Sequence, residues 1–186
     1  MRKDFSIEGQ QQISKSAEPF YLIDLEIPRE CYDLQDCLYS FFSEKKVHDY
    51  KFKGKNVGAS QRYMFEKLPN VLCIHIKRFI YTNERVIKAK EHIDFDEVLT
   101  IDDNYLSPSL KLGIFNKERK ELPKYRLFSV VEHVGMKASS GHYVSHTMDC
   151  EDCWKKMDDR NVRNQQIESV LDKQAYILFY ELMQED

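Results

Sequence analysis

The chain has 186 residues, of which 42% are hydrophobic and 12% aromatic. This is enough for one domain with a buried core, and the aromatic content favours a β-rich one. The 28 basic and 31 acidic side chains give a net charge of −3, which excludes a strong overall field for nucleic acid or an anionic membrane. No apolar run approaches the roughly 20 residues that cross a bilayer, and no signal-peptide pattern opens the chain. The odd number of cysteines, 5 at irregular spacing, argues against a disulfide framework, so we expect an intracellular protein, cytoplasmic or nuclear.

The first part of the chain predicts a polar head, a strand and a helix. Residues 1–17 are polar and we expect them to be poorly ordered, whereas residues 20–27 read as a strand that Pro28 ends. Apolar residues recur at helical spacing after Asp33, a residue type that caps helices, and this predicts an amphipathic helix ending near residue 44. The lysine-rich stretch that follows has few aromatic residues, so it indicates a solvated β-turn region rather than a nucleic-acid site.

The second part predicts strands almost throughout. Residues 71–81 are apolar on both alternating faces, which is typical of a strand at the centre of a sheet. A turn at 82–83 leads to a hairpin partner at 86–89, and residues 125–134 form another long strand. A flexible loop is expected at 135–141, a short helix at 164–171 and a closing strand at 175–180, with no internal domain boundary.

Two strand-like runs after residue 141 suggest a catalytic pair. If residues 142–148 run out and residues 153–158 return around a turn near Cys150, antiparallel register places His142 opposite Asp158. An imidazole N–H then reaches a carboxylate, which fixes the ring tautomer and stabilises the imidazolium. A slip of one residue would give this role to Asp159. The hairpin by itself favours the alternative, a histidine that is tied to a carboxylate only for stability.

The remaining cysteines and histidines have simpler interpretations. Apolar surroundings predict core thiols and core histidines, as for Cys37, Cys73, His75 and His133. Cys150 and Cys153 form a Cys-x-x-Cys pair four residues after His146, but a structural zinc site usually has four ligands and no fourth lies nearby. We therefore expect turn residues there, with a partial zinc site or a redox pair as alternatives.

A series of segments extends this picture to most of the chain. They are Glu18-Pro19-Phe20 with 25–27, Leu34–Leu38 with Glu44, Leu68–Phe79, Tyr125–Gly135, Ser140-Gly141-His142-Tyr143, Trp154, Met157-Asp158-Asp159 and Ala175–Tyr180. Their order and spacing resemble the C-terminal half of the catalytic domain of the ubiquitin-specific protease family of cysteine deubiquitinases, including its "LPxVLxxHLKRF" strand. The resemblance implies an α+β, papain-like cysteine protease fold: residues 18–183 form an antiparallel palm and fingers sheet with few helices, a tail follows at 184–186, and the thumb subdomain is missing.

The resemblance also implies roles for residues around the histidine. His142 becomes the general base, Asp158 the residue that orients it, and Asp159 a second carboxylate close by. The implied reaction is hydrolysis of the isopeptide or peptide bond after the C-terminal glycine of ubiquitin, so the implied partners are ubiquitin and ubiquitinated proteins. The loop at 135–141 lies where the family has a mobile loop over the substrate channel, with its glycines as hinges. The implied substrate-binding residues are Gly135, Ser140, Gly141 and Tyr143.

The chain departs from the family at its nucleophile. No Asn-Thr-Cys-Tyr box is present, and Cys31-Tyr32, the nearest imitation, reads better as the start of a helix. Without a thiolate the chain alone is expected to be inactive. It is then the histidine-bearing part of a deubiquitinase whose thumb segment and cysteine lie elsewhere, or an inactive ubiquitin-binding pseudoenzyme; an unrelated hydrolase using Cys31 is a third reading. Residues 9–16 and 50–62 contain no cysteine for the family's fingertip zinc, so we expect no metal or cofactor.

Overall fold

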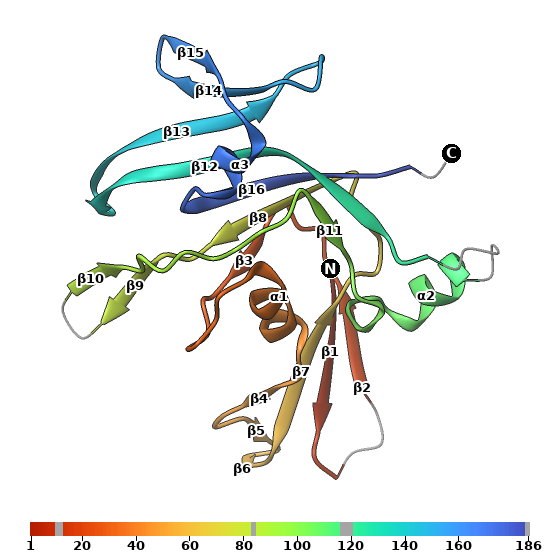
Figure 1. The fold of residues 1–186 in the computed structure, drawn as a ribbon. Coiled ribbons are helices and arrows are strands. Elements are labelled where there is room, and N and C mark those ends of the chain that lie inside the picture. The colour runs from red at the N-terminus through yellow and green to blue at the C-terminus, as the bar shows by residue number, and fades with distance from the viewer. Residues whose placement is uncertain (10–12, 83–84, 116–120, 185–186) are drawn as a thin grey trace. The chain divides into compact units, whose positions relative to one another are not determined.

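In the computed structural model, which describes residues 1–9, 13–82, 85–115 and 121–184, the chain folds as two units (Figure 1). Unit 1 contains residues 1–20, 39–68 and 101–123, and unit 2 contains residues 21–38, 69–100 and 124–186. The single domain expected from the sequence stays a prediction, because two compact units can belong to one domain. Each unit gathers its own sheet and core from segments that alternate along the chain, a pattern that no local composition change marks.

Unit 1 is built on a four-stranded antiparallel sheet in the order β2-β1-β7-β4. Its elements are β1 (Arg2–Ile7), β2 (Ile13–Ala17), β4 (Lys45–Val47), β5 (Lys51–Phe52), β6 (Lys55–Asn56), β7 (Ala59–Met64), a 3₁₀ turn η1 (Asp103–Tyr105) and α2 (Pro108–Phe115). Strands β1 and β2 replace the poorly ordered segment expected at 1–17. Their side chains do not alternate between buried and exposed, so the pairing rests on backbone hydrogen bonds that a hydrophobic pattern does not reveal.

Unit 2 contains an eight-stranded sheet in the order β15-β14-β13-β12-β16-β8-β3, with β11 also paired to β12. Its strands are β3 (Ile23–Leu25), β8 (Val71–Ile76), β11 (Val98–Thr100), β12 (Lys124–Lys137), β13 (Ser140–Met148), β14 (Trp154–Asp158), β15 (Asn161–Asn164) and β16 (Ala175–Leu182), beside the hairpin of β9 (Phe79–Thr82) and β10 (Arg85–Lys88). Every pair is antiparallel except β3 with β8. The mixed α+β class is confirmed.

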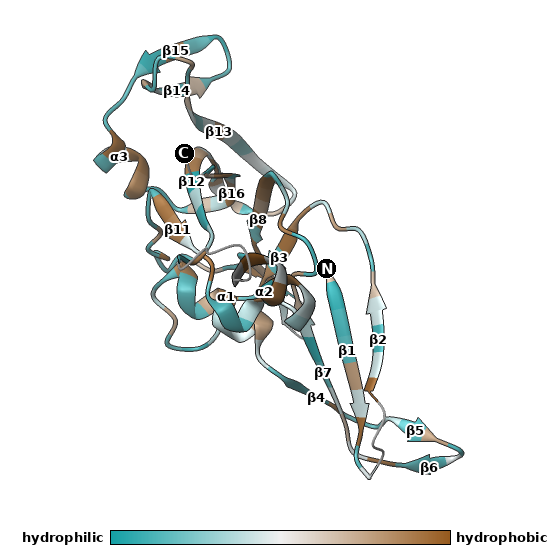
Figure 2. Cartoon of the chain, turned by 90° about the vertical axis from the view of Figure 1, so that its right-hand side faces the viewer, coloured by the Kyte–Doolittle hydropathy of each residue, from teal (hydrophilic) through white to brown (hydrophobic). Residues whose placement is uncertain are grey.

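Helices α1 (Leu34–Phe42) and α3 (Ile167–Leu171) complete the fold. The capping prediction for α1 is confirmed, because the Oδ1 atom of Asp33 accepts a hydrogen bond from the backbone N–H of Asp36 at 2.7 Å. The apolar strand β8 stands out from the mostly hydrophilic β1 in Figure 2, and its inward residues Leu72, Ile74 and Ile76 are fully buried. No helix in the described part of the chain has the length and apolar character of a membrane span.

The strand expected at 71–81 divides into β8 and β9 at residues 77–78. The reason is Arg78, whose guanidinium is fully buried and donates hydrogen bonds to the carbonyl oxygens of Ala175 at 2.6 Å and Glu91 at 2.7 Å. A buried cation of this kind needs several acceptors, and a continuous strand would send the side chain away from them. The hairpin partner predicted after residue 83 is present as β10, although residues 83–84 lie outside the described residues.

Candidate active site

His142 lies on β13 and Asp158 on the neighbouring strand β14, which is next to the edge strand β15 of the unit 2 sheet. Strand β13 pairs with β14 from Ser145 opposite Met157 to Met148 opposite Trp154. This register places residue 144, not residue 142, across from Asp158, so the predicted pairing was wrong by two residues. The turn spans residues 149–153 and is two residues longer than the predicted register requires. Within it Asp152 adopts a left-handed conformation with φ of 58°.

A shift of two residues preserves the face to which each side chain points. His142 and Asp158 are therefore diagonal neighbours on one face, within reach of each other. The Nε2 atom of His142 lies 2.7 Å from Oδ1 of Asp158, a hydrogen-bond distance. The predicted contact between His142 and Asp158 is therefore present in the structure, between diagonal neighbours rather than directly opposed residues.

The free ring nitrogen and the exposure of the pair decide what it can do. With Nε2 facing the carboxylate, Nδ1 of His142 has no hydrogen-bond partner among the residues that the structure describes, and 43% of the side chain is exposed. Asp159 follows in the turn to β15. A ring nitrogen of His142 and one carboxylate oxygen each of Asp158 and Asp159 lie within 4.8 Å of one another. An imidazole oriented on one nitrogen and open on the other is the arrangement of a general base.

The charges of the pair reinforce one another. The pKa of His142 is raised, chiefly because Asp158 accepts its hydrogen bond, and the pKa of Asp158 is lowered, chiefly by His142 and then by Lys156. The stability due to the raised pKa of His142 is present at low pH and lost as the pH rises through that pKa. The stability due to the lowered pKa of Asp158 is present at higher pH and lost as the pH falls through that pKa. The ion pair therefore persists in the window between the two.

The loop expected at 135–141 is a hairpin instead. Strand β12 continues to Lys137 and β13 begins at Ser140, with Val134 opposite His142 and a register shift between Val134 and Lys137. Gly135 has a φ of 134°, which only glycine adopts readily. The extra residue of this bulge lets the chain turn tightly without leaving the sheet. The interpretation of the two glycines as hinges stays a prediction.

Gly141 is required for a different reason. A Cβ atom at this position would lie 2.1 Å from Nε2 of His133, so the imidazole of His133 occupies the space that a side chain would need. His133 is buried, as predicted, and contacts the rings of Tyr143 and Phe79. Of the four expected substrate-binding residues, Ser140 and Gly141 immediately precede His142 and Gly135 lies across the hairpin. Tyr143 belongs to the opposite face, because neighbouring residues of a strand alternate.

Lys88 supports the strand beside His142. Its side chain is buried, and its Nζ donates to the carbonyl oxygens of His133 at 2.5 Å and Gly135 at 2.9 Å. These two residues flank Val134, the residue opposite His142. A cavity of about 550 Å³ opens here, lined by Lys88, Lys90, Glu132, His133, Val134, Gly135, Met136, Asp172, Lys173 and Gln174. The sequence offered no signal for Lys88, because its acceptors lie more than 40 residues further along the chain.

Cys31, the nearest imitation of the family's nucleophile, is buried at the start of α1. Its sulfur lies 3.2 Å from the sulfur of Cys37 and 3.3 Å from the carbonyl oxygen of Asp33. Burial raises the pKa of the Cys37 thiol, and Cys31 adds to this effect. A buried thiol whose neighbour is another thiol is a poor nucleophile, in agreement with the interpretation of Cys31 as a residue at the start of the helix.

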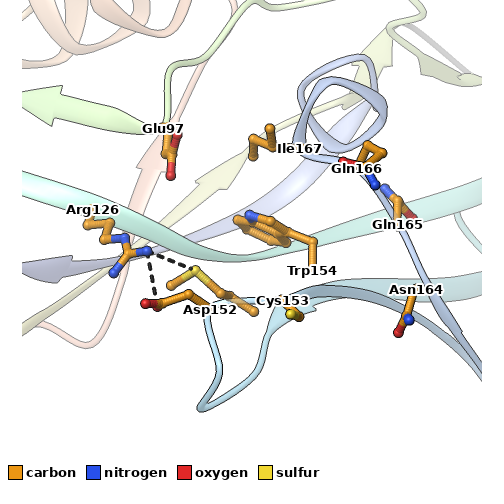
Figure 3. Close-up of a pocket in the computed structure, with 10 residues that line it drawn as sticks. Glu97, Arg126, Asp152, Cys153, Trp154, Asn164, Gln165, Gln166 and Ile167 are labelled. Carbon is orange, nitrogen blue, oxygen red and sulfur yellow. Dashed lines mark hydrogen bonds and ion pairs between the residues drawn. The ribbon is translucent and has the colours of Figure 1, made fainter.

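Cys150 and Cys153 are exposed in the turn between β13 and β14, as expected. His146 does not join them, because it is fully buried and both ring nitrogens are engaged, with Glu132 at 3.0 Å and Gln165 at 2.9 Å. A cavity of about 360 Å³ lies near this turn, lined by Glu97, Arg126, Met148, Asp152, Cys153, Trp154, Asn164, Gln165, Gln166 and Ile167 (Figure 3). It opens at the end of β13 remote from His142, roughly 20 Å along the strand.

Lys156 is a residue at the pair that the sequence interpretation missed. Its Nζ lies 3.2 Å from Oδ2 of Asp158, the oxygen that His142 leaves free. Strand alternation was a usable signal, since residues 156 and 158 of a strand share a face.

Comparisons with known proteins identify the family of the chain. The family described as ubiquitin carboxyl-terminal hydrolase matches residues 6–180. Ubiquitin carboxyl-terminal hydrolase 10 of Rattus norvegicus is 35% identical over 185 residues, which are 94% of this chain and 23% of the relative. Ubiquitin hydrolase B of Dictyostelium discoideum is 32% identical over 187 residues, which are 98% of this chain and 39% of the relative.

Solved structures show the same relationship. A chain of the SAGA DUB module Ubp8/Sgf11/Sus1/Sgf73 bound to monoubiquitin matches all of this chain with a TM-score of 0.83 and 28% identity, and a module bound to ubiquitin aldehyde matches with 0.82 and 28%. This chain covers 41% of each. It therefore spans less than half the length of these relatives. The family match over residues 6–180 and the relatives of 35% and 32% identity show that the chain belongs to the ubiquitin carboxyl-terminal hydrolase family of cysteine deubiquitinases.

Proposed function

We propose that this chain supplies the general base and the orienting carboxylate of a cysteine deubiquitinase. In this assignment His142 takes a proton from a cysteine thiol, and Asp158 holds the ring through Nε2 and stabilises the imidazolium. Asp159 adds negative charge near the ring. The bond cleaved is the isopeptide or peptide bond that follows the C-terminal glycine of ubiquitin.

One observation supports this proposal most strongly, namely the 2.7 Å contact between Nε2 and Asp158 with Nδ1 left open toward solvent. His146, by contrast, is fully buried and uses both ring nitrogens internally, with Gln165 and Glu132. It is a structural histidine of the same chain for comparison. The binding of ubiquitin by the matched modules supports ubiquitin as the partner of this chain.

The nucleophile is proposed to lie on residues outside this chain. Buried Cys31 and Cys37 are poor candidates, and exposed Cys150 and Cys153 lie at the end of the hairpin away from His142. The chain alone should then not react with a ubiquitin probe that carries a C-terminal electrophile. An inactive ubiquitin-binding protein is the alternative.

A chimera tests the proposal directly. The region of Dictyostelium discoideum ubiquitin hydrolase B that matches this chain is replaced by residues 1–186, and cleavage of a ubiquitin C-terminal fluorogenic amide is measured. We expect activity that His142→Ala abolishes, because the thiol loses its base, and that Asp158→Ala reduces strongly. His48→Ala, a change at an exposed histidine of unit 1, should leave the rate unchanged.

Two results would contradict the proposal. A chimera that folds and binds ubiquitin but does not cleave the amide would favour the ubiquitin-binding alternative. Activity that survives His142→Ala would show that the base is another residue. Circular dichroism and ubiquitin binding of each variant separate a loss of chemistry from a loss of fold.

A further inference from the structure

Lys156 contacts the carboxylate that orients the base, but from the other oxygen. Asp158 faces Nε2 of His142 with Oδ1 at 2.7 Å and Nζ of Lys156 with Oδ2 at 3.2 Å. The three side chains form a line of cation, carboxylate and imidazole on one face of the sheet. A single negative charge is therefore shared by two cationic partners whenever His142 is protonated.

Among the charged groups around His142 and Asp158, Lys156 is the cation that contacts the pair. The groups that act on His142 are Asp158, Asp159 and Lys156. On β12 the residue opposite His142 is the uncharged Val134, and Glu132, further along the same face, is bonded to His146. On β15, Asn161 lies opposite Asp158 and Arg163 lies opposite Lys156. Apart from His142 itself, no other cation of the described chain forms a salt bridge with Asp158.

We propose that Lys156 is a positioning residue for this reaction: it holds the second oxygen of Asp158 and so limits how strongly that carboxylate retains a protonated His142. This inference rests on the proposed function, because a weaker hold of Asp158 on the protonated ring matters only if His142 acts as a general base. A base must reach the thiol unprotonated, and an acid that bound the imidazolium too strongly would leave it protonated at rest.

Opposing contributions thus meet at His142. Asp158 raises the pKa of the ring chiefly by accepting its hydrogen bond, whereas burial lowers that pKa and Lys156 lowers it further, by a smaller amount, through charge repulsion. Lys156 also contributes to the lowered pKa of Asp158. Removing the ammonium should therefore move both groups in the same direction, toward a higher pKa. Disruption of the fold around the pair would instead lower the pKa of His142, since the hydrogen bond to Asp158 would be lost.

The experiment is an NMR titration of the His142 ring in the chain itself. Lys156→Met removes the charge and keeps most of the side-chain volume, whereas Lys156→Arg keeps the charge. Lys155→Met is the matched control: Lys155 is the preceding residue of β14, points to the other face and pairs with Asp149 at 2.7 Å. It changes the net charge of the chain by the same unit without touching Asp158.

We expect Lys156→Met to raise the pKa of His142 clearly above that of the unmodified chain, and Lys156→Arg and Lys155→Met to leave it near the unmodified value. An unchanged or lowered pKa of His142 in Lys156→Met would overturn the inference. An equal rise of this pKa in Lys155→Met would also overturn it, because the effect would then come from the net charge of the chain and not from the contact with Asp158. The titration needs no nucleophile and no ubiquitin. Its failure is therefore distinct from the failure of the chimera.

Discussion

Gly141→Ala tests whether the hairpin before His142 is built around the absence of a side chain. The added Cβ would lie 2.1 Å from Nε2 and 2.5 Å from Cε1 of His133, and 2.9 Å from the carbonyl oxygen of Val134. Real Cβ contacts are essentially never shorter than 3.0 Å. The ring and the strand would have to separate by almost an ångström at the closest contact.

His133 cannot make this room by itself. Its ring is 4% exposed and packs against Tyr143, Phe79 and Tyr176, with centroids 4.9, 5.2 and 6.2 Å away. Overpacking of this kind typically costs about 1–3 kcal/mol. Urea unfolding followed by the fluorescence of Trp154, the one tryptophan of the chain, measures the loss in unit 2.

Two variants make the test specific. Gly113→Ala adds a methyl group where nothing lies within 4 Å, so it should not destabilise the chain. In the double variant Gly141→Ala with His133→Ala, the second change removes the clashing ring, so the total loss should be smaller than the sum of the two single losses. Additive losses, or a Gly141→Ala variant as stable as the unmodified chain, would refute the packing argument.

Further predictions concern buried groups. Arg78→Met should destabilise unit 2 by at least about 2 kcal/mol in denaturant unfolding, because it leaves buried carbonyl oxygens without donors; the partly exposed Lys77→Met is its control, and equal losses would contradict the argument. A thiol reagent should modify Cys150 and Cys153 rapidly in the native chain and Cys31 slowly, as measured by mass spectrometry of the modified peptides. Rapid modification of Cys31 would contradict its assignment as a buried residue.

Much of the fold could be predicted because the signals are local. Helix α1 has both its apolar spacing and the Asp33 cap in one short stretch. The long strands β12 and β16 follow from continuous apolar and aromatic runs. Strands β1 and β2 could not be predicted, since β2 is exposed throughout, and the break at Arg78 depends on acceptors from β16 and residues 89–91.

The sequence predicted which two residues form the candidate site, His142 and Asp158, but not the register of the strands that carry them. Residues 142 and 158 come within reach of each other both when they are directly opposed and when the register is shifted by two residues, so the predicted contact holds despite the error of two. The register follows from the length of the turn, which cannot be read from the sequence, and the left-handed conformation of Asp152 within that turn is only suggested by its side-chain type. Lys88 and Lys156 were missed, the first because its contacts are distant in sequence.

Titration of the His142 ring in the unmodified chain and in Asp158→Asn tests the central claim most directly. The carboxylate favours the protonated ring, so a neutral amide at the same position should lower the pKa of His142. The account also predicts that the neutral ring carries its proton on Nε2, with Nδ1 free to accept one. The same pKa in both proteins, or a neutral ring with its proton on Nδ1, would contradict the pairing on which the proposed chemistry depends.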